Sequence, residues 1–303
     1  MLHMKLARSL AARRGSMSTA SMRCLTACLL LLVLTGTNAQ AQSEPQRAIT
    51  PIAGDLYRFQ NNFHYSVFLV TSDAIIATDP IDAGAAQWLK SELSRRFPGK
   101  PIRYVIYSHS HADHIAGGQV LADTATVVAH ERAKERILAE QVPTAVPALT
   151  FSDRMTIEAG GKRVELHYLG RNHSDNTIVM RFPDERALFA VDIVAVKRLP
   201  YRDFPDGYLD EWIQTLKTLE SMDFDILAPG HGTLGTRADV AEHRRYLELL
   251  RERVKREMDA GRSLEEIKRV VTMPEYASWG SYRDWVELNV EGMHRYLRMR
   301  ASN

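Results

Sequence analysis

The chain has 303 residues, and 39 lysine and arginine residues against 37 acidic residues give a formal net charge of +2. Five of the basic residues and none of the acidic ones precede position 42, so residues 42–303 carry a net charge of −3. This balance argues against a nucleic-acid partner, because such proteins present an excess of positive charge. The 262 residues from position 42 onward suffice for one large domain.

The first 41 residues have the pattern of a secretory signal peptide. Basic residues from Lys5 to Arg23 precede the apolar run Leu25–Leu34, and Ala39-Gln40-Ala41 predicts cleavage after Ala41. The apolar run is too short for a permanent membrane span. We therefore expect a periplasmic or secreted protein of residues 42–303, and the position of the true start codon stays open.

Both cysteines, Cys24 and Cys28, belong to this leader. The mature chain then has no thiol and no disulfide, so its stability must come from a core. Any metal site in it must use nitrogen and oxygen ligands.

Apolar runs of strand length dominate the first half of the remaining chain, and several are apolar at consecutive positions, which predicts strands buried on both faces. A second group of strands follows, and each group is accompanied by segments with helical periodicity. The predicted strands are 55–59, 65–70, 74–79, 103–108, 126–130, 153–159, 162–169, 176–182 and 186–194, with a further strand in 223–231 that runs into a loop. The predicted helices are 85–97, 131–140, 209–219, 237–260, 264–271 and 282–299, and another begins within 115–122. Two groups of strands with helices after each indicate a single layered α/β sandwich.

The stretch "YSHSHADH", residues 107–114, directly follows a buried strand. It places His109, His111, Asp113 and His114 within six residues. Loops at the carboxyl end of a strand are where open α/β sheets usually carry their chemistry. Such side chains would be unsatisfied in a core and have no evident purpose on a surface, so we interpret the motif as a metal-binding platform.

The motif resembles the signature of the metallo-β-lactamase superfamily, and four further positions of that family occur in the expected order. Asp79 ends the strand "AIIATD", and His173 lies in "GRNHSDN". Asp192 lies in "LFAVDIV", and His231 lies in "LAPGHG". The resemblance covers nearly all of residues 42–303. It implies a four-layer αββα sandwich of two mixed sheets flanked by helices.

The same resemblance implies two metal ions, and zinc suits the ligand types, although iron and manganese also accept them. His109, His111 and His173 would hold the first ion, while Asp113, His114 and His231 would hold the second. Asp192 would bridge the ions or bind the second one. Asp79 would support a ligand histidine from outside the site. A metal-bound hydroxide would then attack a carbonyl group, with Asp113 orienting it and passing a proton to the leaving group.

Two departures place the chain between known branches of that family. The β-lactamases proper have a similar segment around position 192, but they carry cysteine where this chain has Asp192. They carry arginine where this chain has His114. The ligand set resembles that of hydroxyacylglutathione hydrolases and lactonases. The flanking sequence typical of the hydroxyacylglutathione hydrolases is absent, and "GRNHSDN" stands in its place. We expect a small-molecule ester, lactone or amide as substrate, with a β-lactam as the alternative. A non-catalytic metal-binding protein or a di-iron redox protein on the same scaffold is the alternative of another class, and the oligomeric state stays open.

Several further residues are candidates for the substrate pocket. Phe63 and Tyr65 precede the first long strand, where they would cover an apolar substrate or serve as ordinary hairpin residues. Asn172 and Asn176 are candidates for donation to an oxyanion, although Asn176 would equally satisfy loop backbone. Lys197 is a candidate partner of a substrate carboxylate, and a solvated surface charge is the alternative. We expect the neighbouring His64 to be a loop histidine and not a ligand.

Overall fold

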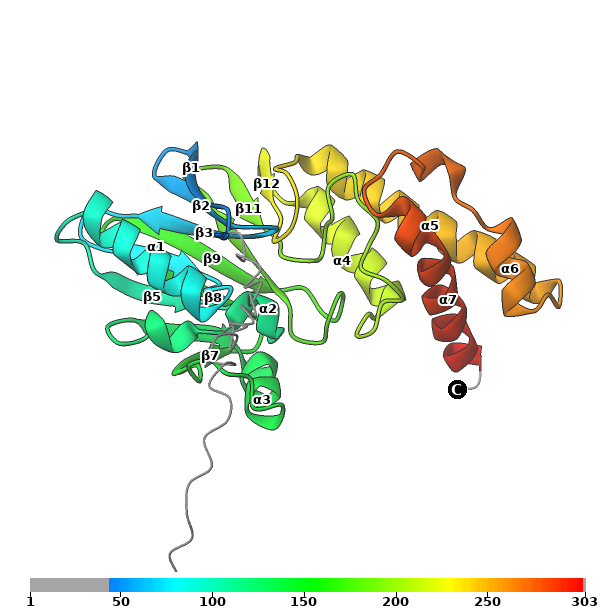
Figure 1. Cartoon of the computed structure of the whole chain (residues 1–303), viewed down its shortest axis with the longest axis horizontal. Coiled ribbons are helices and arrows are strands. Elements are labelled where there is room, and N and C mark those ends of the chain that lie inside the picture. The colour runs from blue at the N-terminus through cyan, green and yellow to red at the C-terminus, as the bar shows by residue number, and fades with distance from the viewer. Residues whose placement is uncertain (1–43, 302–303) are drawn as a thin grey trace, which may run out of the picture. The chain divides into compact units, whose positions relative to one another are not determined.

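The computed structural model describes residues 44–301, which form two β-sheets with helices on their outer faces (Figure 1). The predicted signal peptide and both cysteines lie outside the described residues. Within the described part of the chain, no helix is long and apolar enough to cross a membrane.

The first sheet has seven strands in the order β1 to β7. Neighbours are antiparallel from β1 to β4 and parallel from β4 to β7. The carboxyl ends of β4 and β5 and the amino end of β3 therefore lie at the same edge. The bounds are β1 Arg47–Ala53, β2 Leu56–Asn61, β3 His64–Val70, β4 Ile75–Thr78, β5 Ile102–Ile106, β6 Thr126–His130 and β7 Leu149–Phe151.

The second sheet has five strands in the order β12, β11, β10, β9, β8. Its strands β8 to β11 are antiparallel, and β12 joins β11 in parallel. Both sheets are therefore mixed. The bounds are β8 Arg154–Ala159, β9 Lys162–Tyr168, β10 Ile178–Phe182, β11 Ala187–Phe189 and β12 Ile226–Ala228.

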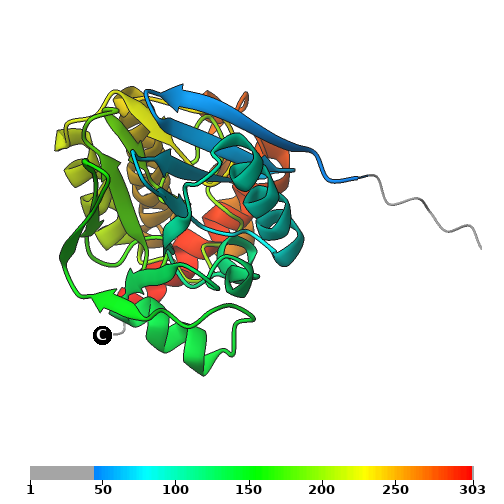
Figure 2. The ribbon, with the colours of Figure 1, turned by 90° about the vertical axis from the view of Figure 1, so that its left-hand side faces the viewer.

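Helices cover the outer face of each sheet, as the side view in Figure 2 shows. Helices α1 and α3 pack on the first sheet, and α4, α5 and α7 pack on the second. The bounds are α1 Ala83–Arg96, α2 Ala112–Ile115, α3 Glu131–Ala139, α4 Leu209–Ser221, α5 Arg237–Asp259, α6 Leu264–Val270 and α7 Tyr282–Ala301, with short 3-10 helices at Gly118–Val120 and Pro274–Tyr276.

The layers are held by three groups of buried apolar side chains, one between each pair of layers. The group between the sheets contains Leu69 and Ile106 from the first sheet and Val164 and Met180 from the second. These side chains alternate with residues that face the helices, so strands of both sheets are apolar at consecutive positions for the reason inferred from the sequence. The expected αββα sandwich is confirmed.

Two predicted elements differ from the structure at functionally relevant places. The predicted strand 186–194 ends at Phe189, and Asp192 has a left-handed backbone with φ 58°. The predicted helix within 115–122 is instead the short helix α2, which begins before that range, followed by Gly117 at φ 77° and a 3-10 turn. In both segments the apolar composition predicted a regular helix or strand. The chain instead turns there, and the turn places candidate ligands at the site. Strand β1 was not predicted, because Pro51 and its exposed residues conceal an edge strand.

Candidate metal centre

The candidate ligands lie where several strands of the two sheets end at one edge. His109, His111, Asp113 and His114 follow β5, and His173 lies in the loop between β9 and β10. Asp192 follows β11, and His231 follows β12. The amide of Ile178 donates to the carbonyl of Ser108 over 2.9 Å, which fastens the edge of one sheet to the edge of the other.

Two groups of donor atoms share Asp192. Within each group, one donor atom from every residue lies within 4.8 Å of all the others. Asp192 Oδ2 lies 3.2 Å from His114 Nε2 and 3.5 Å from His173 Nε2, and Asp192 Oδ1 lies 3.4 Å from His231 Nε2. The groups are His109, His111, His173 and Asp192, and His114, Asp192 and His231.

A buried relay determines which nitrogen of His109 faces the site. Asp79 accepts the Ser108 hydroxyl over 2.6 Å and the Ser108 amide over 2.7 Å. Because the hydroxyl hydrogen is used there, Ser108 Oγ accepts from His109 Nδ1, 2.9 Å away. The fully buried His109 Nε2 then carries a lone pair and has no hydrogen-bond partner. Asp79 therefore acts on His109 through Ser108, while its own distance to His114 Nδ1 is 3.9 Å.

His111 is oriented from the opposite side. Its Nε2 lies 3.3 Å from Asp206 Oδ2, and its Nδ1 lies 3.2 Å from His173 Nε2. Donation of Nε2–H to Asp206 leaves Nδ1 as the free donor atom. The sequence reasoning missed Asp206, which lies in an irregular loop between β11 and α4 with no motif around it.

His231 is oriented by main chain. Its Nδ1–H donates to the carbonyl of Phe63 over 3.0 Å, so its Nε2 faces Asp192 and lies 3.1 Å from His114 Nε2. The loop that carries it is held by Arg58 of β2. That guanidinium donates to the carbonyls of Pro229 over 3.2 Å and Gly232 over 2.6 Å. Burial lowers the pKa of Arg58 to about 10.

The site is electrostatically polarised. Burial lowers the pKa of His109 well below its usual range, so this imidazole stays neutral. Burial acts against the charge of Asp192 as well, but His114 and His231 outweigh it and hold the pKa of Asp192 well below its usual value. Burial likewise raises the pKa of Asp79 to about 6. Although burial opposes it, Asp192 raises the pKa of His114 to about 9, so this imidazole must release a proton when a metal ion binds.

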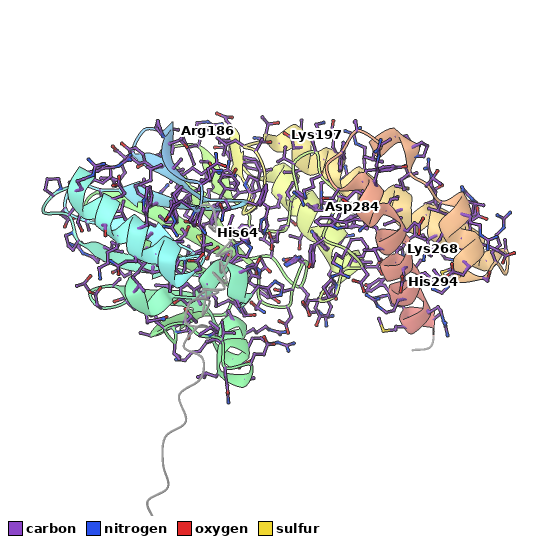
Figure 3. The ribbon with its side chains drawn as sticks, in the orientation of Figure 1. His64, Arg186, Lys197, Lys268, Asp284 and His294 are labelled. Atoms are coloured by element: carbon purple, nitrogen blue, oxygen red, sulfur yellow. The ribbon has the colours of Figure 1, made fainter. Side chains whose placement is uncertain are left out.

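The expectation that His64 is a loop residue is wrong, because His64 begins strand β3. Its Nε2 lies 3.3 Å from Asp113 Oδ2, and its ring lies 4.6 Å from that of His231. His64, Asp113 and His231 form a third group of donors within 4.8 Å. Figure 3 shows His64 at the edge of the sheets, well apart from Lys197 and His294. The sequence carries no signal for this placement, because His64 lies outside every motif.

The side chains of the two asparagines proposed for oxyanion binding form hydrogen bonds within the loops of the centre. Asn176 accepts the Ser110 amide over 2.9 Å and donates to Ser110 Oγ over 3.2 Å. Asn172 is fully buried and donates to the carbonyl of Gly170 over 3.0 Å. Of the two functions considered for Asn176, the structure shows the loop-holding one.

The other pocket candidates also have different surroundings from those envisaged. Lys197 forms an ion pair with Glu242 of α5, so its charge is already neutralised away from His64 (Figure 3). The ring of Tyr65 lies 3.6 Å under the Arg58 guanidinium. Phe63 is 78% exposed at the tip of the β2–β3 hairpin, which leaves it available to a bound substrate.

A polar cavity of about 270 Å³ opens beside His111. Arg136 and Asp175, an ion pair at 2.9 Å, form one wall. The remaining walls come from both flanking loops, so a molecule in this cavity would contact the ligand loop and the loop of Asp206. The lining residues are Ser110, His111, Arg136, Glu140, Ser174, Asp175, Asn176, Pro205, Asp206, Gly207 and Tyr208.

The sequence profile of the metallo-β-lactamase superfamily matches residues 78–231, half of the chain, and this range contains every residue of the centre except His64. The chain is also similar to the 2,4-dinitroanisole O-demethylase subunit alpha of a Nocardioides strain, with 30% identity over 192 residues. That match covers 62% of this chain and 58% of the demethylase subunit, so it spans little more than half of that relative.

A metallo-β-lactamase type 2 of Elizabethkingia meningoseptica is 26% identical over 207 residues, which are 64% of this chain and 81% of that protein. Among solved structures, a metallo-β-lactamase from Pontibacter korlensis aligns with a TM-score of 0.61 and 19% identity. That alignment covers 67% of this chain and 99% of the solved one. At this identity the structural likeness establishes the fold alone.

Proposed function

Because the chain belongs to the metallo-β-lactamase superfamily of metal-dependent hydrolases, we propose that it binds two zinc ions and hydrolyses the carbonyl group of a small ester, lactone or amide. His109, His111 and His173 would hold one ion, and Asp113, His114 and His231 the other. Asp192 would contact both. The observation that carries the proposal is the convergence of two donor groups on the single carboxylate of Asp192.

The donors fit a pair of divalent ions. His109 Nε2 is buried without a hydrogen-bond partner, and its other nitrogen is already engaged by Ser108. The remaining donor nitrogens face one another at 3.1 Å, between His114 and His231, and at 3.2 Å, between His111 and His173. Imidazole nitrogen and carboxylate oxygen, without thiolate, are ligands that zinc, iron and manganese all accept, and zinc commonly takes such sets.

Zinc ions held by these residues would lower the pKa of bound water and polarise a carbonyl oxygen. The chain supplies the remaining functions. Asp113, half exposed, is placed to hold a proton and pass it to a leaving group at the mouth of the centre. Although burial opposes it, the hydrogen bond from His64 lowers the pKa of Asp113 to about 2, so the carboxylate is ionised, as a metal ligand must be.

Two relatives suggest alternatives for the substrate. The resemblance to metallo-β-lactamases at 26% identity supports a β-lactam amide as one alternative. The greater identity to a protein named for demethylation of 2,4-dinitroanisole favours a second candidate, an activated aryl methyl ether. Both would use the same centre, so the substrate panel below contains all of these classes.

We also propose that the protein acts outside the cytoplasm after cleavage behind Ala41. The support is the order of basic residues, apolar run and Ala39-Gln40-Ala41 in the sequence. Amino-terminal sequencing of the protein recovered from periplasm or medium should begin at Gln42. An unprocessed chain found in the cytoplasm would contradict export.

The decisive experiment measures metal content and turnover on the same purified sample. We expect two zinc ions per chain and chelator-sensitive hydrolysis of at least one member of a panel of chromogenic cephalosporin, lactones, aryl esters and 2,4-dinitroanisole. Asp113→Ala should lower turnover by orders of magnitude, whereas Asp184→Asn, in an exposed turn between β10 and β11, should not. Iron in place of zinc would overturn the metal assignment, and near-normal turnover by Asp113→Ala would overturn the proton-transfer role.

A further inference from the structure

The β2–β3 hairpin brings His64 to the carboxylate of Asp113. We propose that His64 is a positioning residue whose Nε2–H donates to Asp113 and fixes that carboxylate beside His231. The inference rests on the proposed function, because it takes Asp113 and His231 as ligands of the second ion.

The side-chain geometry defines the contact. His64 Nε2 lies 3.3 Å from Asp113 Oδ2, and the two side chains are 29% and 52% exposed. The ring of His64 meets that of His231 edge to face, with centroids 4.6 Å apart, and lies 5.7 Å from the ring of His114. We assign the proton to His64 Nε2, which then donates to Asp113 Oδ2 and leaves the ions to the donors of the two groups that share Asp192.

The main chain fixes the hairpin to the loop of His231. His64 and His231 form an antiparallel bridge, and the amide of Tyr65 donates to the carbonyl of Gly230 over 2.8 Å. In return, His231 Nδ1–H donates to the carbonyl of Phe63. The hairpin therefore cannot shift without moving His231, and His64 holds a fixed position relative to both residues.

Arg58, in strand β2 of the hairpin, strengthens the same connection. Its guanidinium lies against the ring of Tyr65 and donates to the carbonyls on both sides of His231. The placement of His64 is thus built from side chains and main chain of both segments. A carboxylate ligand is free to rotate about its side-chain bonds. The hydrogen bond from His64 to Oδ2, which also lies 3.6 Å from His114 Nε2 and 3.8 Å from His231 Nε2, restricts that rotation.

The test compares His64→Ala, His64→Gln and, as a matched control, His294→Ala on α7, which lies well apart from the centre (Figure 3). Each purified protein is stripped of metal and titrated with zinc against a chromophoric chelator, and with cobalt while visible absorption is recorded. We expect His64→Ala to bind the second ion about 10–100-fold more weakly and the first ion normally. His64→Gln should recover most of the loss, because its amide N–H also donates but is a poor ligand.

The outcomes separate this inference from the proposed function. Two ions bound with equal affinity by wild type and His64→Ala would overturn the inference and leave the proposed function standing. A His64→Gln variant as weak as His64→Ala would overturn the positioning role, because a donor would then not suffice. A wild-type protein that binds fewer than two ions would overturn both.

Discussion

Asp206 and Asp79 act on the centre through a single histidine each, His111 directly and His109 by way of Ser108. In both cases a carboxylate outside the centre decides which ring nitrogen keeps its proton. The nitrogen that faces the other donors is then unprotonated, which is the state a metal ligand needs. The residues around the centre are therefore as specific to its chemistry as the donors themselves.

Asp206→Asn should weaken the first metal position. An amide oxygen accepts from His111 Nε2–H more weakly than a carboxylate does and favours that tautomer less, so we expect zinc affinity at that position to fall by about 10–100-fold. Zinc titration of the metal-free protein measures this, with Asp184→Asn as the control. Unchanged affinity would show that the contact with Asp206 does not orient His111.

His243 predicts a pH dependence of stability that is independent of the centre. It is fully buried in α5 near the ring of Trp212, and burial lowers its pKa from 6.5 to about 4. Between pH 6.5 and 4 the unfolded chain binds a proton that the folded chain does not. The free energy of unfolding therefore falls as pH falls through this range, and the contribution of His243 is fully present above pH 6.5. The loss is about 3 kcal/mol at full extent.

His243→Leu removes this titration. Urea unfolding at several pH values should show a shallower fall for His243→Leu than for wild type between pH 6.5 and 4. Equal slopes for the two proteins would mean that His243 is not protonated differently in the folded and unfolded chain.

At the scale of elements, helix α2 carries Asp113 and His114, and Gly117 follows its C-cap residue Ala116. That glycine has φ 77°, and a Cβ there would overlap the backbone of Ala83 at the start of α1. The carbonyl of His114 accepts the amide of Ile81 over 2.6 Å. The close approach at Gly117 thus sets how far α2, and with it half of the ligand motif, lies from α1.

Gly117→Ala and Gly99→Ala separate crowding from backbone strain. Gly99 has φ 80° but open space around its Cβ position, so alanine there should cost only about 1–2 kcal/mol of unfolding free energy. Gly117→Ala adds the crowding and should cost about 2–5 kcal/mol. Urea unfolding of both variants measures the difference, and equal losses would contradict the steric argument.

The parts of the fold and centre that were predictable are those with local signals. Consecutive apolar residues identified the buried strands, and His109, His111, Asp113 and His114 are close in the sequence because one loop carries them. His64 and Asp206 were not predictable, since their contacts form between segments far apart in the chain. Asp192 was identified by resemblance, but its left-handed turn was hidden inside an apolar run that resembles a strand.

At the scale of the whole molecule, the proposed ions connect loops from both sheets. The ligands converge only in the folded chain, so metal ions bind the folded state and not the unfolded one. Removing the ions therefore takes their binding free energy away from the stability of the folded state. We expect chelation to lower the melting temperature by several degrees, and added zinc to restore it. A scan of thermal unfolding with and without chelator checks this, and an identical melting temperature would contradict a structural contribution of the ions.

The contact between Phe63 and His231 spans 168 residues of sequence, whereas every donor of the first group lies between His109 and Asp192. A chain still being synthesised therefore completes the first group at Asp192, 39 residues before the second group is completed at His231. If the chain crosses the membrane unfolded, as proposed here, neither group is assembled until it arrives. The identity of the bound ions is then decided by the metals available in the compartment of destination, and not by those of the cytosol in which the chain is made.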